Sequence, residues 1–167
     1  MAHILNGADP SAIQQAAAVL QAGGVVAFPT ETVYGLGANA LNERAVAQVF
    51  AIKQRPAFDP LIVHIADTQD VPRYASHISD RTTALMQRFW PGPLTLVLPK
   101  HAIIPDLVTA GLETVALRVP SHPIARALLQ AAGMPIAAPS ANPFGYVSPT
   151  TAQHVQDTLG ESIEIIL

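Results

Sequence analysis

The chain has 167 residues, half of them hydrophobic and only 13% charged, and its formal net charge is −3. This length is enough for one domain with a sizeable core, while two lysines and seven arginines scattered among twelve acidic residues form no basic stretch for duplex binding. The lack of cysteine excludes disulfides, thiolate metal sites and a cysteine nucleophile. The sequence shows neither an apolar run long enough to span a membrane nor a signal peptide, so we expect a cytoplasmic protein.

The first half of the chain predicts two helices and two strands. Asp9 caps a helix that has Pro10 in its first turn, and Gly23 with Gly24 ends it. Asn42 caps a second helix, whose apolar residues recur at helical spacing as far as Lys53. We expect helices up to residues 21 and 53, strands over 25–28 and 61–65, and a polar loop over 29–37.

The second half continues the alternation. Ser79 begins a helix that stops before Pro91, Ser121 caps a helix that runs to Ala132, and Thr150 or Thr151 opens the last helix. We expect strands over residues 95–98, 115–119, 135–138 and 163–167. Because no clear helix separates the first two of these strands, the sheet is predicted to be mixed, in an α/β (α+β-like) domain that covers residues 1–167. The chain stops within an apolar strand, from which we expect a longer gene product.

The polar loop after the first strand carries three hydroxyls and one carboxylate within five residues. It lies at the carboxyl end of a strand, where open α/β sheets bind ligands. The loop contains neither a Walker sequence nor a GxGxxG fingerprint. Two interpretations stay open, a ligand site and an irregular turn whose hydroxyls bond to the backbone.

Two small polar clusters, about eighty-five residues apart, have the composition of a polyphosphate site. Lys53 and Arg55 follow one another at the end of a helix, and Ser140 and Asn142 occupy a turn after a strand. A lysine and a forked arginine form a useful pair around a triphosphate. The alternative is that both cations are solvated residues, favoured at a helix C-terminus by the macrodipole.

Two further polar residues belong to strands. His64 closes one strand, and a lone histidine there is more often structural than a ligand. Arg118 lies within an apolar strand and needs a partner, which is Glu113, Glu31 or the carboxylate of a ligand. We favour the ligand.

These segments, taken in order, resemble the YrdC-like domain of threonylcarbamoyl-AMP synthases. The resemblance covers nearly the whole chain and includes the K-x-R and S-x-N tetrad of that family. It is carried by residues 29–37, 53–56, 60–64, 90–95, 117–120, 139–142 and 148–151.

The resemblance implies a twisted mixed sheet, flanked by helices, around a concave cavity. It also implies that L-threonine, bicarbonate and ATP, with Mg²⁺, are converted to threonylcarbamoyl-AMP and pyrophosphate. The product would feed threonylcarbamoyladenosine formation in tRNA, through a downstream transfer machinery.

The resemblance further implies roles for individual residues. Catalysis would rest on Lys53 and Arg55, and no metal ligand is assigned. The nucleotide would be bound by Lys53, Arg55, Asp59, Thr114, Ser140, Asn142 and Ser148, and threonine by Thr32, Tyr34, His64, Arg118 and Ala138. Two departures are visible: Asp59 stands where many relatives have Asn, and no glycine-rich turn with a Ser-Thr segment follows the last strand.

Three alternatives come from other classes. An RNA-binding module would use the concave surface, but the acidic net charge restricts it to weak RNA binding. A carbamoyl-adenylating domain of a hydrogenase-maturation protein would bring zinc-finger and acylphosphatase-like signatures, which this sequence lacks. A regulator that only binds nucleotide is the third.

Overall fold

The computed structural model describes residues 1–167 except Arg55, Ala57 and Phe58. Its described part forms one eight-stranded sheet with the order β1-β8-β2-β3-β7-β4-β6-β5. The strands are β1 His3–Ile4, β2 Val26–Phe28, β3 Gly35–Asn39, β4 Ile62–His64, β5 Leu96–Pro99, β6 Thr114–Arg118, β7 Ile136–Ala137 and β8 Ile165–Ile166. The helices are α1 Pro10–Gln21, α2 Glu43–Lys53, α3 Val71–Tyr74, α4 Asp80–Phe89, α5 Asp106–Thr109, α6 Pro123–Ala132 and α7 Ala152–Leu159, with a 3-10 turn over Thr68–Asp70.

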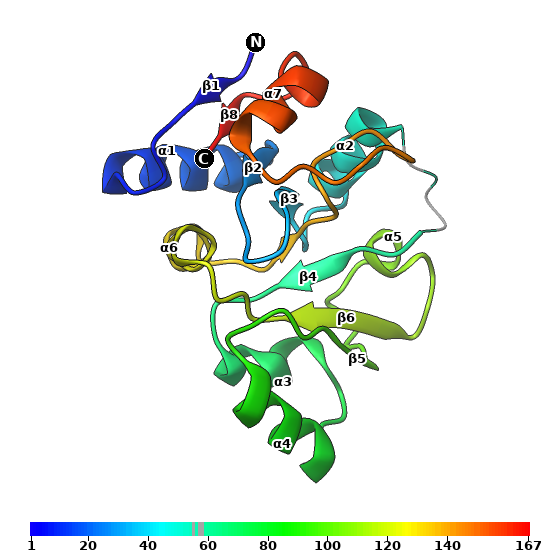
Figure 1. Ribbon diagram of the computed structural model, residues 1–167. Coiled ribbons are helices and arrows are strands. Elements are labelled where there is room, and N and C mark those ends of the chain that lie inside the picture. Colours follow the sequence, from blue (N-terminus) through cyan, green and yellow to red (C-terminus); the bar gives the residue numbers. More distant parts are fainter. Residues whose placement is uncertain (55, 57–58) are drawn as a thin grey trace.

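The sheet is mixed, as the sequence predicted. Strands β4 and β6 run parallel, as do β2 and β8, whereas β5 runs antiparallel to β6 and β7 runs antiparallel to both β3 and β4. Figure 1 shows α3 and α4 together at one end of the molecule, beyond β5 and β6, and α1, α2 and α7 at the other. The α/β architecture with helices around a twisted mixed sheet is confirmed.

One predicted loop is partly a strand. The polar loop was expected to extend to Gly37, but β3 begins at Gly35 and pairs antiparallel with β2. Glycine is depleted in strands, so Gly35 and Gly37 argued against a strand here. Close packing explains why residue 37 is a glycine, because a Cβ at this position would lie 2.7 Å from both the Phe28 ring and Ile136.

Most of the predicted helix caps are confirmed. Asp9, Asn42, Ser79 and Thr151 each accept a hydrogen bond from a backbone N–H in the first turn of their helix. The prediction of Ser121 as a cap is wrong, because His122 takes that position and its Nδ1 accepts from Ile124 N at 3.3 Å.

Proline explains the shift of this cap by one residue. Pro123 occupies the first helical position, and the residue before a proline is driven into extended backbone. His122 has that conformation, at φ −63° and ψ 128°, so the helix cannot begin earlier.

The strands β4 and β6 have one face in the core and one face that is partly open. Val63, Val115 and Leu117 are buried in the hydrophobic cluster that also contains Trp90. The alternate residues Ile62 and Ala116, which pair in register, are only half-buried. The open face therefore gives access to side chains that the sheet holds in fixed positions.

Candidate functional site

A cavity of about 240 Å³ lies over the open face of the sheet. It contains all five residues expected to bind threonine, together with Ser140 from the second polar cluster. The cavity is lined by Thr30, Thr32, Val33, Tyr34, Gly35, Ile62, His64, Arg118, Ala138, Pro139 and Ser140. Segments from β3, β4, β6 and the end of β7 thus meet around one space.

The sheet register places His64 and Arg118 side by side. They are the last residues of the parallel strands β4 and β6, and they are paired in register. His64 also pairs with Ile136 of β7, and Ala138 N donates to Ile62 O at 2.9 Å. These polar side chains are therefore carried by backbone that is hydrogen-bonded on both sides.

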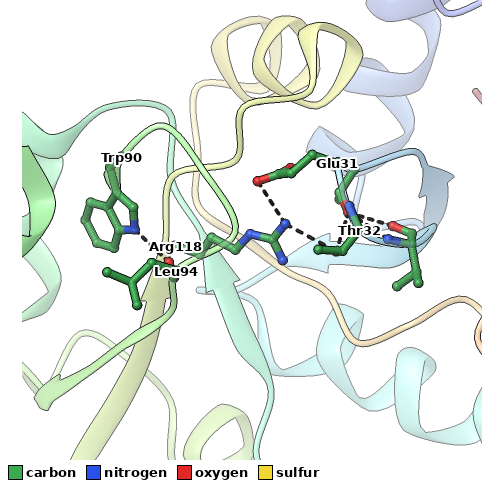
Figure 2. Close-up of polar contacts among 7 residues, drawn as sticks. Glu31, Thr32, Trp90, Leu94 and Arg118 are labelled. Atoms are coloured by element: carbon green, nitrogen blue, oxygen red, sulfur yellow. Dashed lines mark hydrogen bonds and ion pairs between the residues drawn. The ribbon is translucent and has the colours of Figure 1, made fainter. Parts of the chain in front are cut away.

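Arg118 is held by the polar loop between β2 and β3 (Figure 2). Its Nη2 lies 2.9 Å from Glu31 Oε1 in an ion pair and donates to Thr32 Oγ1 at 3.3 Å. Of the two acidic partners that the sequence allowed, Glu31 is the one found. The Nε of Arg118 is buried and has no hydrogen-bond partner among the described residues.

His64 is neutral at physiological pH. Burial is the main cause that lowers its pKa, and the charge of Arg118 adds to it, so the pKa falls to about 4. Its ring packs edge-on against Phe28, with the ring centroids 6.1 Å apart, and within the described residues its Nδ1 has no hydrogen-bond partner. The cavity thus combines an uncharged imidazole with a guanidinium.

Both interpretations of the polar loop have a structural counterpart. Thr30 Oγ1 donates to Val33 O at 2.6 Å and accepts from Thr32 N, which is the turn expected of an irregular loop. Thr32 Oγ1 instead lies 3.0 Å from Thr30 Oγ1 and accepts a hydrogen bond from Arg118 Nη2. One hydroxyl therefore builds the turn, and the next one lies on the cavity wall.

Tyr34 connects the two polar segments. Tyr34 N donates to Pro149 O, and Tyr34 O accepts from Ala141 N, both at 2.8 Å. Burial raises the pKa of the Tyr34 hydroxyl above its ordinary value, so the phenol stays protonated at neutral pH. The loop after β2 and the turn after β7 consequently form one wall.

The two polar clusters meet at Lys53. Its Nζ donates to the backbone carbonyls of Ser140 and Asn142, and its own carbonyl accepts from Phe144 N at 2.8 Å. Only 1% of Lys53 is exposed, so the alternative of a solvated helix-end cation is wrong for this residue. The ammonium instead holds the backbone of the S-x-N turn, and it brings a positive charge to the edge of the cavity.

Asn142 folds the loop that follows. Its Nδ2 donates to Pro143 O and Tyr146 O, each at 2.8 Å, and its residue is buried. Beyond it, Phe144, Tyr146 and Val147 are exposed. The turn is fixed at its base, whereas its tip extends into solvent.

The remaining predicted site residues that the structure describes lie outside the cavity. Thr114 begins β6, four residues before Arg118, so its side chain points to the same face about 13 Å away. Ser148 is exposed on the loop, and Asp59 is half-buried next to the start of β4. Arg55 lies outside the described residues.

Sequence reasoning missed the apolar part of the cavity wall. Val33, Ile62 and Pro139 line the cavity beside the polar groups. Ile62 could have been found, because it alternates with His64 on one face of a strand. Within the part of the chain that the structure describes, no group of three or more ligating side chains could hold a metal ion.

Comparison with known proteins gives the family. The Sua5/YciO/YrdC family model, which carries the description "Telomere recombination", matches residues 18–167. This chain belongs to that family. The fold and the motifs of the family resemblance are therefore confirmed, while the roles of individual residues stay predictions.

Several similar proteins share a name. The threonylcarbamoyl-AMP synthase of Pyrococcus abyssi is 52% identical over 93% of this chain and 46% of its own length. The protein of the same name from Vibrio vulnificus strain YJ016 is 42% identical, over 94% of this chain and 86% of its own length. A crystal structure of P. abyssi Sua5 with L-threonine superposes with a TM-score of 0.93 at 51% identity, over 95% of this chain and 46% of that one. The chain spans about half the length of the Pyrococcus relatives.

The described helices include none with the length and apolar composition needed to cross a membrane.

Proposed function

We propose that this chain makes L-threonylcarbamoyl-AMP from L-threonine, bicarbonate and ATP, with release of pyrophosphate. The observation that carries the proposal is the cavity itself, in which a buried arginine and a neutral histidine meet the S-x-N turn held by Lys53. Support comes from the relatives that bear this enzyme name and from the Pyrococcus structure in complex with L-threonine.

The amino acid would bind with its carboxylate on Arg118. A buried guanidinium nitrogen without a partner among the described residues is costly, and a ligand carboxylate satisfies it with a charge-assisted hydrogen bond. Thr32 and His64 lie next to it and offer a hydroxyl and an uncharged imidazole. Tyr34 and Ala138 complete the wall, and the small side chain of Ala138 leaves room for the substrate.

The nucleotide would extend from the S-x-N turn along the open face of the sheet toward Thr114. Among the described residues, Ser140 is the only member of its predicted set that lines the cavity, so the turn would be where the two substrates meet. Lys53 would act by shaping that turn and by its charge, since its ammonium already holds two carbonyls. Direct contact with the phosphates would fall to Arg55, and Asn142 and Ser148 would contact other parts of the nucleotide.

The chemistry requires two steps. The threonine amine takes up bicarbonate to give a carbamate and water, and a carbamate oxygen then attacks the α-phosphorus of ATP while pyrophosphate leaves. A free carbamate decomposes readily, so the chain must hold both reactants together and limit water. The walls of the cavity and the positive charges of Arg118, Lys53 and Arg55 would supply that positioning and charge stabilisation.

Magnesium would come with the nucleotide. Mg²⁺ in such sites is held by one or two carboxylates together with substrate phosphates, and the described residues provide no all-protein cluster for it. Asp59, which the resemblance assigns to the nucleotide, would be a candidate for that carboxylate, and Mg²⁺ would supply charge neutralisation on the phosphates.

The product would be consumed in the cytoplasm by a machinery that transfers the threonylcarbamoyl group to tRNA. The concave surface leaves room for weak RNA contact, but no basic stretch favours it. Two HypF crystal structures share the fold at 24% and 22% identity, which is too low to carry an activity to this chain.

Pyrophosphate release from ATP tests the proposal. The reaction should depend on L-threonine and bicarbonate together, and omission of either should reduce release to the background. A matched reaction with L-2-aminobutyrate, which differs from threonine only in lacking the hydroxyl, should give much less pyrophosphate. Release that is unchanged without threonine would contradict the proposed function.

A further inference from the structure

Glu31 is a buried carboxylate to which the proposed reaction assigns no task. It lies outside the residues that line the cavity, on the polar loop, and its side chain is 17% exposed. Its Oε1 contacts Arg118 Nη2 at 2.9 Å, from the opposite side to the loop hydroxyl of Thr32 (Figure 2). One nitrogen of the guanidinium is thus held from two directions.

The donors of Arg118 divide into two groups. A guanidinium has five N–H donors in a rigid plane. Glu31 and Thr32 both contact Nη2, while Nε is buried and has no hydrogen-bond partner among the described residues. Because the plane is rigid, fixing Nη2 also fixes the direction of Nε–H.

Two roles for Glu31 are conceivable, and they predict opposite effects of Glu31 on the affinity for threonine. As a competitor, it would occupy Arg118 until the substrate carboxylate displaces it. As a positioning group, it would stay in place and orient the guanidinium for the substrate. Displacement would leave a buried carboxylate without its cation, which is strongly unfavourable.

The surroundings of Glu31 favour the role in which it stays. Both carboxylate oxygens of Glu31 are buried and have no hydrogen-bond partner among the described residues, so the ion pair with Arg118 is the contact that offsets their burial. Burial alone would raise the pKa of Glu31, but the net pKa lies below its ordinary value because its polar surroundings, Arg118 among them, favour the anion.

We infer that Glu31 is a positioning residue for the amino-acid pocket, which acts through Arg118. It holds the guanidinium so that its remaining donors face a substrate carboxylate, and it joins the polar loop to the end of β6. This inference rests on the proposed function, since it gives Arg118 the carboxylate of threonine as its ligand.

The experiment is a double-mutant cycle on the whole chain, with Glu31→Gln, Arg118→Ala and the double variant. The Kd for L-threonine is measured by calorimetry and the KM for ATP by pyrophosphate release. Glu31→Gln should weaken threonine binding about tenfold, with the KM for ATP changed less than twofold. In the Arg118→Ala background the same substitution should weaken threonine binding no further.

Glu113→Gln is the matched control, because Glu113 is an exposed glutamate five residues before Arg118. It should behave as the unmodified chain. If Glu31→Gln fails to fold, Glu31→Asp replaces it and should show the same selective, smaller loss of threonine affinity.

Three outcomes would overturn the inference. Tighter threonine binding in Glu31→Gln would make Glu31 a competitor, an unchanged Kd would give it no role, and an additive loss in the Arg118→Ala background would show that it acts independently. The failure of the proposed function looks different. In that case the unmodified chain binds no threonine, or Arg118→Ala binds it as well as the unmodified chain.

Discussion

The proposed site has two halves, an amino-acid half around Arg118 and a nucleotide half at the S-x-N turn, and they are built in different ways. The amino-acid half uses the ends of β4 and β6, where His64 and Arg118 are paired in register and buried. The nucleotide half uses a turn whose backbone is held by the ammonium of Lys53 and whose tip, with Phe144 and Val147, is exposed. The first half is held by sheet pairing and by the ion pair with Glu31, while the second depends on one buried cation.

This difference assigns separate tasks to the two halves. A pocket fixed by sheet hydrogen bonds can discriminate among small amino acids, because its groups cannot move to accept a poor fit. A turn with an open tip can admit a long nucleotide along the sheet. Substitutions in the two halves should therefore affect different kinetic constants, and the predictions below run from the largest expected effect to the smallest.

Arg118→Ala should break the amino-acid half. The loss of a charge-assisted contact to the substrate carboxylate should raise the KM for L-threonine about a hundredfold, which corresponds to about 2.7 kcal/mol. The KM for ATP should change little. Arg81→Ala, on exposed α4, is the control and should leave both constants unchanged. A variant that binds threonine normally would refute the carboxylate assignment.

Lys53→Met should break the nucleotide half and weaken the fold. It leaves the carbonyls of Ser140 and Asn142 without their donor, which should lower the free energy of unfolding by about 2 to 4 kcal/mol. Pyrophosphate release should fall at least about tenfold. Chemical denaturation and the release assay measure the two effects.

Lys100→Met gives a matched control for Lys53→Met. Lys100 is the other lysine of the chain, directly follows the edge strand β5 and pairs with Asp106, and β4 and β6 separate β5 from β7, which precedes the S-x-N turn. It should reduce stability without a selective loss of release. Normal release by folded Lys53→Met would contradict the role given to the turn.

His64 should make stability depend on pH. Since burial lowers its pKa from an unfolded value near 6.5 to about 4, the unfolded chain takes up a proton first as the pH falls. Stability is therefore lost from about pH 6.5 down to about pH 4. Between pH 7 and pH 5 this group alone should cost about 2 kcal/mol.

Denaturant unfolding at both pH values measures this loss. Between pH 7 and pH 5, His64→Gln should lose about 2 kcal/mol less stability than the unmodified chain. The control His101→Gln, at an exposed position, should lose as much stability as the unmodified chain. Equal losses in all three chains would mean that His64 is not a buried neutral histidine.

Ser148→Ala should have the smallest effect. Ser148 is exposed on the loop tip, so one solvent-accessible hydroxyl should change the KM for ATP by only about threefold and leave threonine binding unaltered. A much larger change would indicate that the loop closes over the nucleotide more tightly than its exposure suggests.

Local signals predicted the elements of the fold well. Capping side chains and glycines located α1, α2, α4 and α7 because their chemistry lies within four residues of the helix end. The two-residue strands β1 and β8 pair with each other across the whole chain, and β1 went unpredicted because two residues carry no periodicity. Strand β3 was missed because Gly37 is required by its contacts with Phe28 of β2 and Ile136 of β7. These contacts between strands leave no local pattern in the sequence.

Sequence predicted most of the polar residues that gather at the cavity, although not Thr30, and it did not predict their contacts. It left Glu31 and Glu113 as equal protein partners for Arg118, and only Glu31 forms the ion pair. That choice depends on the loop folding back onto β6, which no local pattern encodes. The burial of Lys53 was hidden for the same reason, since its acceptors lie 87 and 89 residues away.

The most direct test compares L-threonine with L-threoninamide, in which a neutral amide of similar size replaces the carboxylate. Calorimetric titration of each into the unmodified chain measures how much of the affinity depends on the carboxylate. Arg118 as the carboxylate ligand predicts that L-threonine binds about a hundredfold more tightly than its amide. Equal affinity for the two compounds would contradict the account, because it would mean that the buried arginine serves only Glu31.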